Sequence, residues 1–136
     1  MIKNRIKALR NKFIQNERFS YDISENYFDT YSKSKLMITD LSGTAYTFAF
    51  FVLSPVIFLS PNEKKIEENE YSNYNFFLDR KKIGEVVFDE SQVIDKIKFV
   101  FENYNLYEKN IIQLRSNMKY LNKTTIEIKK FIEKLS

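Results

Sequence analysis

The central hydrophobic stretch of the chain predicts a strand, a turn, a helix and a second strand. Leu36–Thr39 and Val56–Leu59 are short apolar runs of strand length. Between them, Asp40–Gly43 has the composition of a turn, and Thr44–Leu53 is long enough for three helical turns before Pro55. Two buried strands joined by an apolar helix predict a right-handed parallel crossover, because parallel neighbours need a long connection.

The segments on either side continue this alternation. Phe19–Ile23 is predicted to be a strand, and Ser24–Ser32 a helix capped by Ser24, with Tyr27, Phe28 and Tyr31 facing inward. Residues 60–74 are polar and lack periodicity, which is typical of a surface loop. Glu85–Phe88 is the last predicted strand. The pattern predicts an α/β fold, a partial doubly wound, Rossmann-like parallel sheet.

Three amphipathic helices are predicted after the last strand. Asp89 with Gln92 resembles a capping pair before the first, and Thr124 with Glu127 a capping box before the third. We interpret their apolar stripes as core positions rather than as a cofactor site. The stripes are Val93, Ile94, Ile97, Val100, Phe101 and Tyr104; Tyr107, Ile111, Leu114, Met118 and Leu121; and Ile128, Phe131, Ile132 and Leu135. At 136 residues, one domain is expected, with an α/β layer in 1–90 and helices in 91–136.

The N-terminal segment predicts a basic amphipathic helix. Its apolar positions recur at helical spacing and its other faces are basic. Such a helix is either the solvated helix of a globular domain or an element that adsorbs to an anionic membrane surface. No apolar signal-peptide core follows it, so a cytoplasmic location is expected, with peripheral contact to the inner face of the membrane under the second interpretation. The apolar positions are Ile2, Ile6, Leu9 and Phe13, and the basic ones Lys3, Arg5, Lys7, Arg10 and Lys12.

The amino-acid composition limits the chemistry that the side chains of this chain can perform and the partners that they suit. Lys and Arg number 22 against 18 Asp and Glu, a net charge of +4 that suits anionic partners. The chain contains neither His nor Cys, which excludes His-based acid–base catalysis, disulfides and Cys or His metal sites within it. No metal or cofactor is expected. Its basic groups are dispersed among carboxylates without a nucleic-acid-binding motif, so no nucleic-acid partner is expected.

The turn after the first crossover strand is the candidate binding site. A helix N-terminus at the carboxyl end of a parallel strand has free N–H groups and a positive dipole end, which favour an anion such as phosphate. Gly43 allows close backbone approach, and Ser42 can cap the helix or donate to a ligand. The same residues equally fit an N-cap and a turn glycine without a ligand. A second candidate is the pair Asp79 and Arg80, since the guanidinium fork suits phosphate, although a surface ion pair has the same sequence.

The pattern Lys35-Leu36-Met37-Ile38-Thr39-Asp40-Leu41-Ser42-Gly43, followed by Phe48-Ala49 and Pro55-Val56-Ile57-Phe58, resembles bacterial CDP-glycerol glycerophosphotransferases and related capsule or teichoic-acid transferases. The resemblance covers roughly residues 11–101 and implies part of the C-terminal, donor-nucleotide half of a GT-B fold. It implies a CDP- or UDP-linked polyol or sugar as donor. In this interpretation Ser42, Gly43 and Thr44 hold the donor pyrophosphate, Asp40 orients the turn or a ribose hydroxyl, and Arg80 neutralises developing phosphate charge.

Two functions follow from these observations. The first is a donor-nucleotide-binding fragment of a glycerophospho- or glycosyl-transferase for capsule or cell-wall polymers, incomplete as a stand-alone catalyst. An acceptor-domain protein is then an expected partner, and strands missing before Phe19 would favour a homo-oligomer. The alternative is a non-catalytic assembly module or a degenerate remnant, in which Thr47 stands where such transferases carry an acidic residue.

Overall fold

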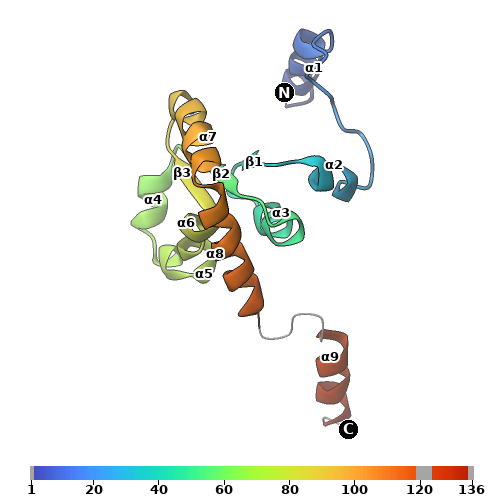
Figure 1. The fold of residues 1–136 in the computed structure, drawn as a ribbon, viewed down its shortest axis with the longest axis vertical. Helices are drawn as coiled ribbons and strands as arrows, with labels where there is room; N and C mark the ends of the chain where they lie inside the picture. Colours follow the sequence, from blue (N-terminus) through green and yellow to red (C-terminus); the bar gives the residue numbers. More distant parts are fainter. Residues whose placement is uncertain (1, 119–123, 135–136) are drawn as a thin grey trace. The chain divides into compact units, whose positions relative to one another are not determined.

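The structure, a computed structural model, describes residues 2–118 and 124–134, which fall into two compact units, Met1–Lys33 and Ser34–Ser136 (Figure 1). The first unit contains helices α1 (Ile2–Phe13) and α2 (Phe28–Lys33). The second contains the sheet and the remaining helices. Within the described residues, none of the helices has the length and apolar character that a membrane span requires.

The first unit corrects two predictions. Phe19–Ile23 is not a strand, and the helix expected over Ser24–Ser32 is limited to α2, in which no residue is buried. Asp22 explains part of this difference, because its carboxylate accepts the Ser24 N–H at 2.8 Å and the Thr30 hydroxyl, so local side-chain bonds replace a strand ladder. Hydrogen bonding by the Ser24 side chain, then by the Thr30 hydroxyl and the Ser24 N–H, lowers the pKa of Asp22 to about 2.

The aromatic side chains expected to face a core from the second helix pack on one another instead. The rings of Tyr27 and Phe28 lie 4.6 Å apart between centroids, and those of Tyr27 and Tyr31 lie 5.0 Å apart. Tyr27 and Phe28 remain exposed. The prediction of an inward-facing position is therefore wrong for Tyr27 and Phe28, while Tyr31 is half-buried.

The second unit is built on a three-stranded parallel sheet, as predicted. Strands β1 (Met37–Thr39), β2 (Val56–Leu59) and β3 (Gly84–Val87) lie in the order β1-β2-β3, and both neighbouring pairs are parallel. The connection between β1 and β2 is helix α3 (Thr44–Val52), which buries Ala45, Phe48 and Ala49. A mixed α/β fold with a parallel sheet is confirmed.

The segment between β2 and β3 is helical, which corrects the predicted surface loop over residues 60–74. It forms α4 (Glu63–Glu67), the 3-10 helix η1 (Glu70–Asn73), α5 (Asn75–Leu78) and α6 (Arg80–Ile83). Each is only about one turn long, so hydrophobic periodicity had too few positions to reveal them.

In the described part of the chain, three α-helices follow the last strand, as predicted, although Tyr104 begins the second helix rather than ending the first and Met118 lies beyond the end of the second. After the 3-10 helix η2 (Glu90–Gln92) come α7 (Val93–Glu102), α8 (Tyr104–Ser116) and α9 (Thr124–Glu133). Asp89 caps η2 rather than α7: its carboxylate accepts the Ser91 N–H at 2.7 Å, while the Gln92 side chain accepts the Phe88 N–H at 3.0 Å and not that of Asp89. Leu121 and Leu135 of the predicted stripes lie outside the described residues.

Strand register assigns the core to two faces of the sheet. Ile57 pairs with Glu85 and Leu59 with Val87, so these four side chains share one face. That face packs against α7 and the start of α8 through Val93, Ile97, Val100 and Tyr107. The opposite face carries Val56 and Phe58, both fully buried. Figure 1 shows α7 beside β2 and β3.

Candidate functional site

The predicted turn lies where expected, between the carboxyl end of β1 and the start of α3. It brings together four of the predicted site residues, which are consecutive or nearly so in the chain: Asp40, Ser42, Gly43 and Thr44. All are exposed except the half-buried Ser42. Because the strands are parallel, this turn shares one edge of the sheet with the segments that follow β2 and β3.

Hydrogen bonds within the turn are local. The Ser42 hydroxyl accepts the Thr44 N–H at 3.3 Å and lies 2.8 Å from the Thr44 hydroxyl. The Ala45 and Tyr46 N–H groups donate to the Ser42 and Gly43 carbonyls, each at 3.2 Å. The Gly43 N–H donates to none of the residues that the structure describes. Ser42 therefore stabilises the start of α3, while the Gly43 amide keeps its bonding capacity.

Gly43 leaves the outer side of the turn open. Its φ of −60° and ψ of −21° are right-handed helical values that any residue adopts. A Cβ built at this position meets no heavy atom within 4 Å. The glycine is therefore not required by backbone geometry, and its contribution is the space beside its amide.

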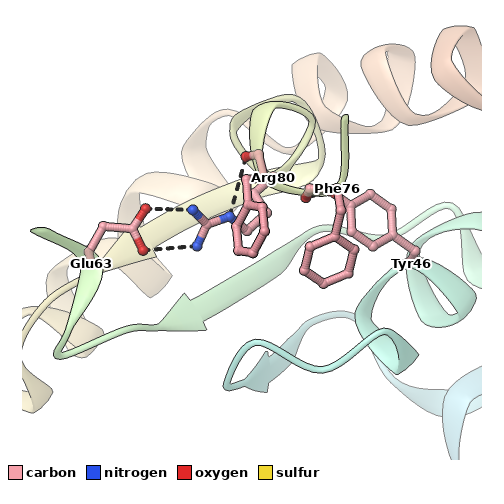
Figure 2. Close-up of polar contacts among 5 residues, drawn as sticks. Tyr46, Glu63, Phe76 and Arg80 are labelled. Carbon is pink, nitrogen blue, oxygen red and sulfur yellow. Dashed lines mark hydrogen bonds and ion pairs between the residues drawn. The ribbon is translucent and has the colours of Figure 1, made fainter. Parts of the chain in front are cut away.

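Arg80, the fifth predicted site residue, lies in α6 and is 3% exposed. Its guanidinium donates two hydrogen bonds to the Glu63 carboxylate, from Nη2 to Oε1 at 2.5 Å and from Nη1 to Oε2 at 3.0 Å (Figure 2). Its Nε donates to the Phe77 carbonyl at 3.3 Å. The guanidinium carbon lies 5.1 Å from the Phe77 ring centroid and 5.8 Å from that of Phe58. None of these Arg80 contacts is with the described residues of the 40–44 turn.

Sequence analysis did not identify Glu63, which lies 17 positions before its partner. Burial opposes ionisation of its carboxyl, but the hydrogen bonds and charge of Arg80 and the charge of Lys81 outweigh it, so the pKa of Glu63 is lowered. Among the described residues, no side-chain hydrogen bond joins the neighbouring Asp79 to Arg80. Asp79 instead accepts Lys82 Nζ at 2.7 Å. The predicted phosphate-binding fork is therefore occupied by a carboxylate.

A hollow of about 370 Å³ lies between α3, α5 and α8. At its wall the Tyr46 hydroxyl donates to the Phe76 carbonyl at 2.5 Å, and the two rings lie 5.3 Å apart (Figure 2). Burial, and then the nearby Asp79 carboxylate, raise the pKa of Tyr46. This hydrogen bond and ring contact join α3 to α5. The lining residues are Tyr46, Phe50, Asn75, Phe76, Asp79, Leu114, Asn117 and Met118.

Glu85 organises a second polar cluster, on the face of the sheet that α7 covers. Its carboxylate accepts the Tyr107 hydroxyl and Lys96 Nζ, each at 2.6 Å. Burial, followed by the hydrogen bond and charge of Glu85, raises the pKa of Tyr107. A glutamate inside a short apolar strand was the sequence signal that could have revealed this cluster. Its bonds join β3 to α7 and α8.

Residues 2–118 and 124–134 contain no preformed cluster of metal-binding side chains. No group of three or more acidic, His or Cys side chains lies there in an arrangement that could hold an ion. The chemistry available at the turn is therefore that of backbone amides, two hydroxyls and one carboxylate.

Comparison of the chain with family models, with curated proteins and with solved structures gave no match in any of the three.

Proposed function

We propose that this chain binds the diphosphate of a nucleotide-linked donor, a CDP- or UDP-linked polyol or sugar, as a fragment of a glycerophospho- or glycosyl-transferase. The observation that carries the proposal is the β1–turn–α3–β2 crossover. It has an open glycine amide at the start of a nine-residue helix. In parallel α/β sheets, ligands bind at the carboxyl ends of the strands, where helix N-termini stabilise phosphate.

The roles follow from the bonding of each residue. The Gly43 amide donates to a phosphate oxygen, and the Ser42 and Thr44 hydroxyls, now bonded to each other, turn outward to donate to the same group. Asp40 accepts from a ribose hydroxyl or orients the turn. In this proposal Arg80 does not bind the phosphate itself, because its guanidinium is paired with the Glu63 carboxylate.

The strand order supports assignment to one half of a GT-B fold. Such a half has the order 3-2-1-4-5-6, and the sequential order β1-β2-β3 corresponds to its last three strands. We further propose that a separate acceptor-domain protein or a second copy of the chain completes the catalytic unit.

A non-catalytic assembly module is the second candidate function. The observation that favours it is that the Arg80 guanidinium is buried and paired with the Glu63 carboxylate, since that group was the predicted source of positive charge for phosphoryl transfer. Residues 41–62 contain no Lys or Arg, so the turn itself supplies none. Nucleotide binding separates the two candidates.

Calorimetric titration with CDP and UDP tests the proposal. Gly43→Val is expected to abolish binding, because its side chain would take the open space beside the amide, where a Cβ meets no heavy atom within 4 Å. Ser42→Ala is expected to weaken binding by about 1 kcal/mol for one hydroxyl bond. Ser116→Ala is the matched control, since the Ser116 hydroxyl also forms a local hydrogen bond, to the Gln113 carbonyl, at a site far along the chain from the turn.

Melting temperatures provide the folding control. A nucleotide at a hundred times its Kd should stabilise the unmutated chain by about 2.7 kcal/mol and leave a folded Gly43→Val protein unchanged. Equal affinity in the folded Gly43→Val protein would contradict binding at this turn. Absence of binding by the unmutated chain would favour the assembly module.

A further inference from the structure

Helix α1 is strongly and uniformly basic. Its twelve residues contain five cationic side chains and no carboxylate. Adjacent basic groups repel one another, so this composition needs an anionic partner or a fully solvated helix. The basic residues are Lys3, Arg5, Lys7, Arg10 and Lys12.

The same helix exposes an apolar stripe. Ile6 is 43% exposed, Leu9 57% and Phe13 37%. At 3.6 residues per turn these three positions lie within about 60° of one another around the helix axis. Full solvation leaves this stripe in water, whereas a partner with an apolar layer would bury it.

Cations border the stripe on both sides. Lys12 follows Leu9 by three positions and lies on one border, and Arg10 follows Ile6 by four and lies on the other. Both cations also lie over aromatic rings, Lys12 at 5.3 Å from the Phe13 centroid and Arg10 at 5.2 Å from that of Tyr21. Their charges are therefore held at the boundary between the polar and apolar surfaces.

This arrangement matches the layers of an anionic lipid bilayer, in which phosphate and carboxylate headgroups lie directly above acyl chains. We propose that α1 adsorbs in the plane of such a bilayer, with its apolar stripe among the acyl chains and its bordering cations on the headgroups. A nucleic acid would use the cations and leave the stripe exposed. The proposal is independent of nucleotide binding.

The C-terminal helix provides a contrast within the same chain. Helix α9 also exposes apolar side chains, with Ile128 54% and Phe131 64% exposed. Its sequence, however, includes Glu127 and Glu133 among the basic residues. Mixed charge of this kind gives little attraction to an anionic surface, so the lipid assignment applies to α1 alone.

The test is sedimentation of the whole chain with vesicles of phosphatidylcholine, with and without phosphatidylserine. We expect binding only with phosphatidylserine, and weaker binding as salt rises, because the Debye length falls from about 10 Å at 0.1 M to about 3 Å at 1 M. Replacing Lys7, Arg10 and Lys12 by Gln should weaken binding about a hundredfold, at roughly fivefold per basic residue. The control replaces the exposed Lys64, Lys65 and Lys109 by Gln, which changes net charge equally.

The apolar contribution is tested by Ile6→Gln with Leu9→Gln, which should weaken vesicle binding more than tenfold. The matched control is Ile94→Gln with Leu106→Gln, which removes side chains of similar exposure, 61% and 55%, from α7 and α8. Three results would overturn the proposal: no sedimentation of the unmutated chain at low salt, equal losses in the α1 and control variants, or undiminished vesicle binding by the Ile6 and Leu9 variant. The last would identify a general polyanion site, which equally tight binding to duplex DNA would corroborate.

Discussion

Removal of one partner from the Glu63–Arg80 ion pair is expected to destabilise the Ser34–Ser136 unit strongly. The Arg80 side chain is 4% exposed and that of Glu63 is 3% exposed. Arg80→Met keeps much of the side-chain length and the packing on Phe58 and Phe77, but it leaves the Glu63 carboxylate buried without its two bonds. The free energy of unfolding should therefore report the cost of an unpaired buried charge.

The magnitude follows from burial. Breaking a buried pair by removing one charge costs about 3–5 kcal/mol. For a unit of this size, each kcal/mol lowers Tm by roughly 4–8 °C, so the loss should be at least about 12 °C. The double variant Glu63→Leu with Arg80→Met removes both charges and should recover at least half of the loss, because replacing a whole buried pair by apolar groups is often close to neutral.

Chemical denaturation and thermal melting of the single and double variants measure these differences. The matched control is Lys98→Met, which breaks an ion pair whose side chains are 70% and 86% exposed. Such a surface pair contributes about 0–1 kcal/mol. If Arg80→Met were no more destabilising than Lys98→Met, the guanidinium would not be paired in a dry site and the argument would fail.

The same pair predicts an acid dependence. Because the pKa of Glu63 is lowered on folding, its contribution to stability is present above the ordinary value of 4.5 and is lost as the pH falls through the folded value. Unfolding free energy measured from neutral pH downward should therefore decline in this range. The decline should be smaller in the double variant, and an identical decline in both proteins would exclude Glu63 as its source.

Two further predictions concern the sheet and its connections. Gly84→Ala should lower the free energy of unfolding by more than about 3 kcal/mol, since its Cβ would lie 1.7 Å from the Val56 carbonyl oxygen. Gly43→Ala has open space around its Cβ and should be neutral or stabilising by about 0.4–1 kcal/mol, so equal denaturation midpoints for the two variants would contradict this reasoning. Tyr107→Phe should cost about 1–3 kcal/mol by removing the hydroxyl that donates to Glu85, and an unchanged free energy of unfolding would mean that this bond contributes nothing.

The β1–α3–β2 crossover was predictable because the residues that determine it are close together in the sequence. The apolar runs of β1 and β2, the turn chemistry at residues 40–43 and the helix before Pro55 lie within a single stretch of chain. The parallel direction then follows from the length of the connection. The turn residues were found together for the same reason, since a contiguous motif needs no knowledge of distant contacts.

Elements that depend on distant partners were not predictable. Phe19–Ile23 has the composition of a strand, but strand formation also requires a neighbour, and Asp22 instead bonds to Ser24. Arg80 was assigned to a ligand because the sequence cannot reveal that Glu63, in a segment resembling a loop, is buried beside it. Side-chain pairing across 17 residues is a property of the packed structure.

The pairing of Arg80 changes what catalysis at the turn would require. A phosphate bound there would be held by neutral donors and the dipole of α3, because residues 41–62 carry no charged side chain and the Arg80 fork is filled. Phosphoryl transfer needs cationic groups on the developing negative charge, which dipoles alone supply weakly. If the proposed donor site is correct, the cation must therefore come from outside residues 41–62, either from another segment of this chain or from a partner. If the proposed acceptor-domain protein supplies it, mixing the chain with that protein should produce transfer activity that neither has alone. Binding of donor without such activity would leave the assembly module as the better account.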